Sequence, residues 1–206
     1  MYKEILTQSQ IELLPFIKKF KKNFTLVGGT AIALQIGHRR SIDFDLFTQV
    51  ESLNMMRIKK AYKGLVNIKK HIIHEAFDQI HFQIGEVKIT FFTYPYRIDA
   101  ELQYEAFFNI PDLLTLSAMK AFALGGRAKW KDYVDLYFIL RSFHTLEQIT
   151  QKANEIFGDS FSAKLLRQQL SYFEDIDYSE EVEFMGDEIS KDEIKSFLVD
   201  TAVEKF

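Results

Sequence analysis

Apolar residues show both the period of β-strands and the period of α-helices in the first half of the chain, and the period of α-helices alone from about Pro111 onward. Residues 24–27 form a short apolar run, which predicts a buried strand. Residues 80–84 and 87–92 alternate apolar and polar side chains on either side of a Gly-Glu pair. We therefore expect a β-hairpin with a two-residue glycine turn. Another strand is expected within residues 66–75.

Helical spacing of the apolar residues predicts the remaining elements. An amphipathic helix is expected over about residues 5–20, interrupted or started afresh near Pro15, because proline has no backbone N–H to donate. From Pro111 the period is helical, with Asp112 placed to cap the helix and a Gly-Gly pair to end it. Further helices are expected at residues 30–36, 53–62, 131–141, 146–157, 162–172 and 192–204.

The change of period near Pro111 predicts two parts. We expect an α/β (α+β) core with a mixed sheet over residues 1–105, followed by a helical lobe over residues 106–206 that packs on the core. A chain of 206 residues with 47% hydrophobic content is long enough to bury a sizeable core. No internal repeat divides it further.

Composition narrows the class of protein. The chain has no cysteine, which removes disulfides and thiolate metal sites and suits a cytoplasmic location. It has no apolar run long enough to span a bilayer, and its first residues lack the form of a signal peptide, so no membrane partner is expected. A formal net charge of -3 argues against a strongly basic nucleic-acid-binding surface overall. Any RNA contact would depend on local patches.

One basic patch lies on the expected helix at residues 53–62 and on the segment that follows it. It contains Arg57, Lys59, Lys60, Lys63, Lys69 and Lys70. Such a group is typical of a solvated helix face, and it also fits a surface that follows phosphates. An acidic stretch over residues 174–188 is typical of a solvated loop. The four histidines from His38 to His81 have spacings that fit no single face, so they do not predict a metal cluster.

A glycine pair stands between the expected strand at residues 24–27 and the helix that follows it. We interpret Gly28 and Gly29 as a tight turn that leads into a helix beginning at Thr30. The first N–H groups of a helix have no partner within it, and the helix dipole favours an anion at that end. A triphosphate fits there, with these three residues as its cradle and the Thr30 hydroxyl as an additional donor.

Two aspartates follow in an alternating run, Ile42-Asp43-Phe44-Asp45-Leu46-Phe47. In a strand the apolar set would enter the core, and both aspartates would project from the opposite face. Two carboxylates on one face offer the hard oxygen ligands that Mg²⁺ prefers. Taken singly, a glycine pair also fits an ordinary turn, and Asp-x-Asp also fits an exposed polar edge. The order of the two features is more specific than either.

The order strand, Gly-Gly, helix and Asp-x-Asp strand resembles the core signature of the polymerase-β-like nucleotidyltransferase superfamily. In more detail, GGTAIAL at residues 28–34, GHRRS at residues 37–41 and DFDLF at residues 43–47 are similar to the AbiEii/AbiGii toxin family of nucleotidyltransferases. With a second block of residues described next, the resemblance spans about residues 20–145. It leaves the last third of the chain unmatched.

The second block contains AMKAFAL at residues 118–124, Arg127 and KDYVDLY at residues 131–137. It resembles the helical segment of that family, which has a lysine, an arginine and a Lys-Asp-x-x-Asp-Leu run. Lys120 and Arg127 are two helical turns apart and share a face, from which they would point cations at the triphosphate or the base. A structural ion pair with an acid is an equally open interpretation.

Four further residues are expected to support the site, namely Arg40, Ser41, Lys131 and Asp135. Lys131 and Asp135 stand at i,i+4 spacing, where they would pair with each other and hold the helix. Arg40 and its neighbour Arg39 lie in the link before the aspartates. There they would bind phosphate or a partner, or neutralise the two aspartates in the metal-free protein. Ser41 belongs to the same link.

The resemblance implies transfer of a nucleoside monophosphate from a nucleoside triphosphate (NTP) to an RNA end or a protein hydroxyl, opposed by an antitoxin protein. Such transfer needs an attacking hydroxyl, an α-phosphate and a pyrophosphate leaving group in line, and two Mg²⁺ ions can neutralise the charge on the attacking and leaving oxygens. Asp43 and Asp45 are the expected catalytic and metal-binding residues. Transfer to a small-molecule hydroxyl shares this chemistry and stays open.

The sequence departs from the superfamily at the next strand. Active members usually carry a third carboxylate there, whereas the run at residues 87–92 offers Thr90. A hydroxyl with its ordinary, very high pKa does not act as a base near neutral pH, and it is a poorer Mg²⁺ ligand than a carboxylate. Either another acid substitutes, with Glu75, Glu86 and Asp99 nearest in sequence, or activity is reduced. A nucleotide-binding or interaction module is therefore the second function class.

Overall fold

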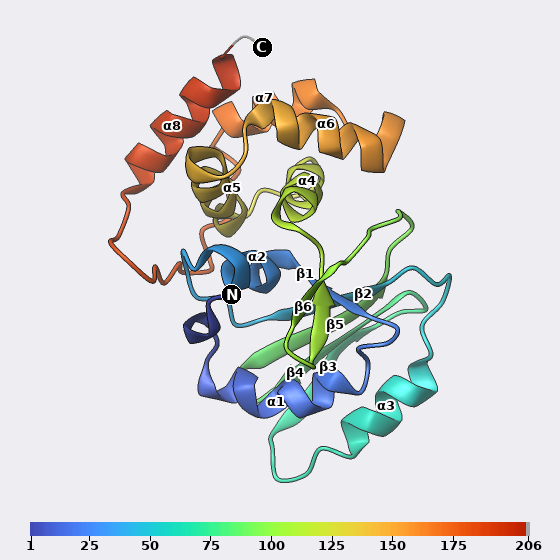
Figure 1. Cartoon of the computed structure of the whole chain (residues 1–206). Helices are drawn as coiled ribbons and strands as arrows, with labels where there is room; N and C mark the ends of the chain where they lie inside the picture. Colours follow the sequence, from blue (N-terminus) through green and yellow to red (C-terminus); the bar gives the residue numbers. More distant parts are fainter. Residues whose placement is uncertain (205–206) are drawn as a thin grey trace. The chain divides into compact units, whose positions relative to one another are not determined.

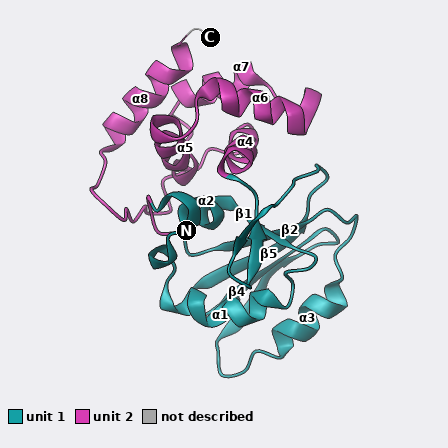
Figure 2. Cartoon of the chain, in the orientation of Figure 1, with its two compact units in different colours: residues 1–37, 41–112 teal, residues 38–40, 113–206 magenta. Residues whose placement is uncertain are grey.

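The structure is a computed structural model that describes residues 1–204. The chain divides into two compact units (Figure 2). Unit 1 comprises residues 1–37 and 41–112, and unit 2 comprises residues 38–40 and the chain from residue 113 onward. Residues 38–40, which lie in sequence between the glycine motif and the aspartates of unit 1, therefore belong to unit 2. A division into functional domains at residue 105 stays a prediction.

Unit 1 is built on a seven-stranded sheet with the order β3-β4-β5-β2-β1-β7-β6 (Figure 1). The strands are β1 (Thr25–Val27), β2 (Phe44–Thr48), β3 (Lys70–Glu75), β4 (Gln79–Ile84), β5 (Val87–Thr93), β6 (Leu102–Tyr104) and β7 (Phe108–Ile110). β2 runs antiparallel to β1 and parallel to β5. The prediction of an α/β core with a mixed sheet is confirmed, and the predicted hairpin is β4–β5. The β6–β7 pair has no counterpart in the sequence prediction.

Three helices belong to unit 1: α1 (Gln8–Lys18), α2 (Gly28–Ile36) and α3 (Met55–Lys63), after a short 3-10 turn at Lys3–Ile5. α1 and α3 lie on one side of the sheet and α2 lies on the other (Figure 1).

The predicted interruption of the first helix is wrong. α1 contains Pro15, and a capping box between Thr7 and Gln10 fixes its start. Proline removes only one backbone hydrogen bond, to the carbonyl four residues earlier. That residue, Ile11, is 45% exposed, so its carbonyl can bond to water instead, and the helix continues through Pro15.

One face of the sheet forms the core of unit 1. Phe82 and Phe91 are fully buried on neighbouring strands. The ring of Phe91 lies 4.7 Å from that of Phe20, which follows α1, and Tyr62 of α3 stacks on Phe82 at 4.4 Å. Because side chains alternate along a strand, the opposite face carries Asp45 and its neighbours. Asp45 therefore projects from the face of the sheet opposite the one that α1 and α3 cover.

The strand that carries the aspartates is shifted from its predicted position. β2 begins at Phe44, so Asp43 lies just before the strand. Ile42, which the alternation assigns to the core, is 40% exposed. Phe47 shares a face with Asp45, yet it is 1% exposed because the rings of Phe92 and Tyr94 pack against it. The alternation is correct for Phe44, Asp45 and Leu46 only.

Unit 2 is helical. Its helices are α4 (Leu113–Leu124), α5 (Trp130–Ser142), α6 (Leu146–Phe157), α7 (Ala163–Ser171) and α8 (Lys191–Val203), with a 3-10 turn at Gly158–Ser160. They agree with the predicted helices to within about two residues, because side-chain caps such as Thr145, Ser162 and Ser190 mark the starts. Within residues 1–204 no helix is long and apolar enough to cross a membrane.

Candidate functional site

Asp45 lies against the start of α2. It pairs with Val27 in the β1–β2 ladder, so the next residue, Gly28, is beside it. A Cβ atom at Gly28 would lie 2.6 Å from Asp45 Oδ2. Gly28 also has a φ of 74°, which residues with side chains rarely adopt. Glycine is therefore required at position 28 for two reasons, namely the positive φ and the close approach of the Asp45 carboxylate.

The helix begins at the glycine pair itself. The pattern predicts a turn at Gly28 and Gly29 with the helix starting at Thr30, whereas α2 starts at Gly28. Val27 at the N-cap position forms no side-chain hydrogen bond to the helix. The first N–H groups of α2 therefore have no side-chain cap, which suits them to an anionic ligand.

The hydroxyl of Thr30 holds the loop before β2. It is buried, it donates to the carbonyl of Asp43, and it lies 3.0 Å from Ser41 Oγ. In this structure the hydroxyl is engaged within the protein, and its predicted contact with a phosphate stays a prediction. From α1, Gln10 Nε2 donates to the Ser41 carbonyl at 2.9 Å. The position of Asp43 thus depends on three buried polar side chains.

Sequence reasoning missed Gln10. It is 0% exposed although its side chain is polar. One signal was available, because Thr7-x-x-Gln10 fits a capping box, and that motif marks the start of α1. Nothing in the sequence indicates that the same amide reaches the loop at Ser41.

Thr90 stands beside Asp45 in the sheet. β2 and β5 are parallel, and Asp45 and Thr90 are register partners. Register partners on neighbouring strands project from the same face of a sheet. Thr90 is therefore placed where an acid on β5 would face Asp45. Its identity as the third-acid position stays a prediction.

The acids nearest in sequence do not join this row. Glu86 is exposed in the hairpin turn, Glu75 on β3 pairs with Lys59 at 2.6 Å, and Asp99 is exposed beside Arg97. Among residues 1–204, no group of three or more His, Cys, Asp or Glu side chains is arranged to hold a metal ion. Any metal would need ligands from its substrate in addition to the protein.

Unit 2 contains a charge cluster, buried except for Arg127, which we define as Arg39, Lys120, Arg127, Asp132 and Asp135. Asp135 accepts from Arg39 at 2.7 and 3.0 Å. Lys120 Nζ lies 2.9 Å from Asp135 and 2.7 Å from Asp132, and Arg127 lies 3.0 Å from Asp132. Lys120 and Arg127 thus converge on one acid, which agrees with the ion-pair interpretation. The shared helix face predicted for them is wrong, because α4 ends at Leu124 and Arg127 lies after it. Arg39 neutralises Asp135 of α5. From its position in the sequence we expected it to bind phosphate or a partner, or to neutralise Asp43 and Asp45.

The cluster shifts the pKa values of its members. Burial by itself would raise the pKa of Asp135, but Arg39 and Lys120 hold it well below its usual range. Burial also opposes the charge of Lys120, yet Asp132 and Asp135 raise its pKa. His38 Nε2 lies 2.7 Å from Asp135, and burial lowers the pKa of this histidine. The cluster is therefore ionised near pH 7 with a neutral imidazole at its side.

The predicted pair between Lys131 and Asp135 is wrong, because each has other partners. Lys131 Nζ lies 3.0 Å from Glu180, and Asp135 points into the charge cluster. Arg40 Nε donates to Glu183 at 2.9 Å. Glu180 and Glu183 belong to the acidic stretch, so part of that loop is held by ion pairs.

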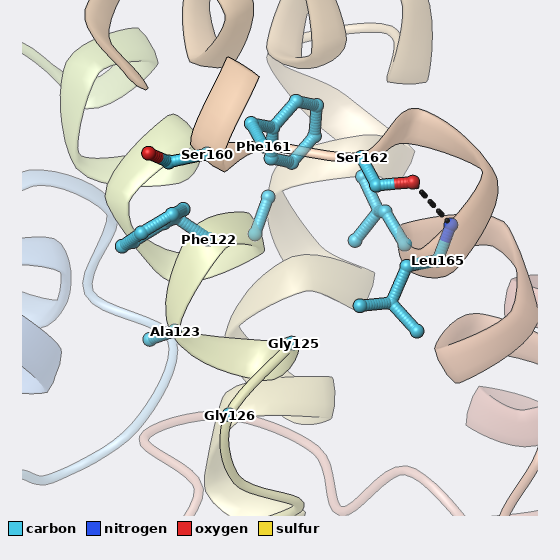
Figure 3. A pocket seen from close by; sticks show the side chains of 10 residues that line it. Phe122, Ala123, Gly125, Gly126, Ser160, Phe161, Ser162 and Leu165 are labelled. Carbon is cyan, nitrogen blue, oxygen red and sulfur yellow. Dashed lines mark hydrogen bonds between the residues drawn. The ribbon is translucent and has the colours of Figure 1, made fainter. Parts of the chain in front are cut away.

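A cavity of about 360 Å³ lies within unit 2 (Figure 3). Phe122 at the end of α4 and Phe161 and Leu165 near the start of α7 contribute its apolar wall. The dashed bond in the figure is the cap of α7, in which Leu165 N donates to Ser162 Oγ at 3.2 Å. None of the lining residues has an ionisable side chain, so the cavity offers no acid or base.

Half of the basic patch is engaged in local contacts. Arg57 and Lys70 donate to backbone carbonyls, and Lys59 pairs with Glu75. The exposed remainder is Lys60, Lys63 and Lys69. A solvated helix face and a surface that follows phosphates both stay open as interpretations. They now concern these three lysines only.

A family model described as "Nucleotidyl transferase AbiEii toxin, Type IV TA system" matches residues 17–204. The chain belongs to this family. The resemblance noted over residues 20–145 is thereby confirmed, and the match extends through the last third. Nucleotidyl transfer is accordingly the general class of reaction.

The chain is also similar to individual proteins. An uncharacterized protein of Aquifex aeolicus (strain VF5) is 29% identical over 188 residues, which cover 85% of this chain and 88% of the relative. The solved structure of MenT4, a nucleotidyltransferase toxin from Mycobacterium tuberculosis H37Rv, superposes with a TM-score of 0.62 at 9% identity, covering 94% of this chain and 81% of that one. JHP933 from Helicobacter pylori gives 0.58 at 15% identity, covering 98% and 91%. These structures show that the fold is shared.

Proposed function

We propose that this AbiEii-family chain is a cytoplasmic toxin that transfers a nucleoside monophosphate from an NTP to a hydroxyl of an RNA end or a protein, and that an antitoxin protein opposes it. The observation that carries the proposal is the packing of Asp45 against Gly28. It brings a carboxylate and uncapped helix N–H groups to one place, where a metal-bound triphosphate would be held from both sides.

The donor set fits Mg²⁺. Asp43 and Asp45 are both half-buried and offer carboxylate oxygens, and the space that a Cβ would fill at Gly28 is left to the Asp45 carboxylate. Two carboxylates leave most of an octahedral shell to other oxygens, which the NTP phosphates would supply. When bound, two Mg²⁺ ions neutralise charge on the attacking and leaving oxygens.

The chain's own residues position the substrate. The backbone N–H groups of Gly29 and Thr30 would donate to the β- and γ-phosphates, helped by the dipole of α2. As the acceptor oxygen bonds to the α-phosphorus, the bond to the bridging oxygen breaks and pyrophosphate leaves. Lys120 and Arg127 remain proposed nucleotide-binding residues. Arg127 suits direct contact better, because its side chain is 53% exposed and that of Lys120 is 5% exposed.

The exposed part of the basic patch supports RNA as the acceptor. Lys60, Lys63 and Lys69 carry positive charge on α3 and at its exit, and such charges attract a phosphate backbone. A protein hydroxyl and a small-molecule hydroxyl are the other acceptors, and the same assay separates them.

The test is incubation with each α-labelled NTP, Mg²⁺ and, in separate reactions, total RNA, protein lysate or small hydroxyl compounds. Label should pass to RNA or protein, and chelation of Mg²⁺ should abolish it. Asp43→Ala should weaken Mg²⁺-dependent nucleotide binding measured by calorimetry, whereas the matched change Glu181→Ala in the acidic stretch should not. Equal nucleotide affinity with and without Mg²⁺ in the native protein would contradict the proposed site.

The toxin assignment has its own test. Induced expression should arrest growth, and co-expression of an adjacent small helix-turn-helix gene should relieve the arrest. The absence of a third carboxylate beside Asp45 favours the second function class, a nucleotide-binding module. Mg²⁺-dependent NTP binding without label on any acceptor would support that class instead.

A further inference from the structure

A histidine stands in the same row of side chains as Asp45 and Thr90. Thr90 on β5 is the register partner of Asp45 on one side and of His81 on β4 on the other. All three therefore project from the same face of the sheet. With strands about 4.8 Å apart, the Cα atoms of Asp45 and His81 are about 10 Å apart. The residue between them is Thr90, whose side chain is short and 7% exposed.

The hydrogen bond of His81 fixes which ring nitrogen accepts a proton. His81 Nε2 lies 3.0 Å from Gln79 Oε1, two residues earlier on the same face. An amide oxygen only accepts, so this bond requires the hydrogen on Nε2. The neutral ring then presents a lone pair at Nδ1. A proton acceptor is thus held in the row by a neighbouring side chain.

The surroundings keep His81 neutral. Burial lowers its pKa below the ordinary 6.5, and Lys88 on β5 and His74 on β3 lower it further, while Asp45 on β2 acts in the opposite direction. The His74 ring lies 5.4 Å from the His81 ring. A neutral imidazole near pH 7 is the form that accepts a proton.

We propose that His81 is a further catalytic residue, which accepts the proton of the attacking hydroxyl where Thr90 replaces the expected third carboxylate. The inference rests on the nucleotidyl transfer proposed above. As the acceptor oxygen forms its bond to the α-phosphorus, its proton passes to His81 Nδ1, the bond from phosphorus to the bridging oxygen breaks, and pyrophosphate leaves with that electron pair. The product imidazolium later returns its proton to solvent.

The first test compares His81→Gln with His71→Gln. Both remove an imidazole from the same sheet, but His71 lies on the exposed edge strand β3. Single-turnover transfer should fall about a hundredfold in His81→Gln and remain native in His71→Gln. Affinity for Mg²⁺ and NTP should stay native in both variants. Native rates with His81→Gln would overturn the inference.

The pH profile separates proton transfer from a structural role. In the native protein the transfer rate should rise with pH and level off above an inflection below about pH 6.5, since His81 must lose its proton to act. This inflection should be missing in His81→Gln. An unchanged inflection in that variant would assign the titration to another group and overturn the inference.

Restoring a carboxylate gives a second variant. Thr90→Asp should raise transfer at least tenfold in the His81→Gln background, and by a smaller factor in the native background, because a base is already present there. An equal gain in transfer rate in the two backgrounds would show that Asp at position 90 and His81 do not both serve as the base. That result would overturn the inference.

Two outcomes distinguish failure of this inference from failure of the proposed function. An active native protein with an active His81→Gln overturns only the inference. A native protein that labels no acceptor overturns the proposed function first. Independently of activity, histidine nitrogen chemical shifts of the protein alone should show His81 neutral with its hydrogen on Nε2. A hydrogen on Nδ1 would overturn the inference.

Discussion

The two aspartates on α5 of unit 2 and Asp45 of unit 1 have opposite surroundings. Asp132 and Asp135 in unit 2 are 3% and 0% exposed, and each touches at least two cationic side chains. Asp45 in unit 1 is half-buried beside Gly28, and within residues 1–204 it forms no ion pair. The difference lies in what neutralises the carboxylate. Asp132 and Asp135 are neutralised by cations of their own protein, whereas a carboxylate without a protein cation fits the metal-binding role proposed for Asp45.

Burial explains why the unit 2 pair needs so many partners. Removing a charge from water costs several kcal/mol, which only close opposite charges and hydrogen bonds offset. Asp132 and Asp135 lie one helical turn apart on α5, so the same inward face presents both to Lys120. The half-buried Asp45 keeps part of its hydration and has no such requirement.

The largest expected effect on stability is that of Asp135→Asn. It leaves Arg39 and Lys120 buried without their counter-charge, so the free energy of unfolding should fall by about 3–5 kcal/mol. Urea denaturation measures this directly. The matched change Asp45→Asn should shift it by less than about 0.5 kcal/mol. Equal losses for the two variants would contradict the difference in surroundings between Asp135 and Asp45.

Asp45→Asn should instead remove function. The change keeps the size of the side chain and removes the charge that a metal requires, so nucleotidyl transfer should fall by at least about a hundredfold. Mg²⁺-dependent NTP binding should weaken with it, as calorimetry would measure. Transfer at the native rate by a folded Asp45→Asn protein would exclude Asp45 as a metal ligand.

Gly28→Ala tests the approach of the carboxylate to α2. Its positive φ should cost about 1–2 kcal/mol of stability, and the added Cβ must also displace Asp45. Gly85→Ala is the matched control, since Gly85 has a φ of 58° and an added Cβ there would meet only ordinary contacts. Thermal unfolding should show a loss of stability in both, at least as large in Gly28→Ala as in Gly85→Ala, and NTP binding should weaken only in Gly28→Ala. Equal NTP affinities would show that the contact does not position Asp45.

The smallest effect concerns Glu180. Burial opposes its charge, but Lys129 and Lys131 lower its pKa to about 2. A carboxyl with a folded pKa below its unfolded value stabilises above the unfolded value, and this stability is lost as pH falls between about 4.5 and 2. Its side chain is 39% exposed, so Glu180→Gln should cost less than about 1 kcal/mol at neutral pH.

Unfolding free energies at pH 7 and pH 3 measure this dependence. The difference between the native protein and Glu180→Gln should be smaller at pH 3. Glu181→Gln, which forms no ion pair within residues 1–204, is the control and should show little difference at either pH. A constant Glu180→Gln effect would mean that the ion pairs of Glu180 contribute nothing to stability.

The sequence by itself determined the elements and the motif at the start of α2. Helix ends are set by neighbouring caps such as Thr145 and by the Gly-Gly pair after α4, and strand periods are equally local. The resemblance in the glycine and aspartate motifs gave the family, which the match over residues 17–204 confirmed. Local patterns failed for β6 and β7, because three-residue strands such as Phe108–Ile110 carry too few positions to show a period.

The partners of the charged residues were decided by the tertiary structure. Helical spacing pairs Lys131 with Asp135, but Glu180 and Arg39 reach these residues from distant parts of the chain. Likewise, the sequence identified Thr90 but assigned His81 no role. The row that contains them follows from strand register across β2, β5 and β4. An ion pair or a shared sheet face depends on distance in space, which spacing along the chain does not fix once the chain folds back on itself.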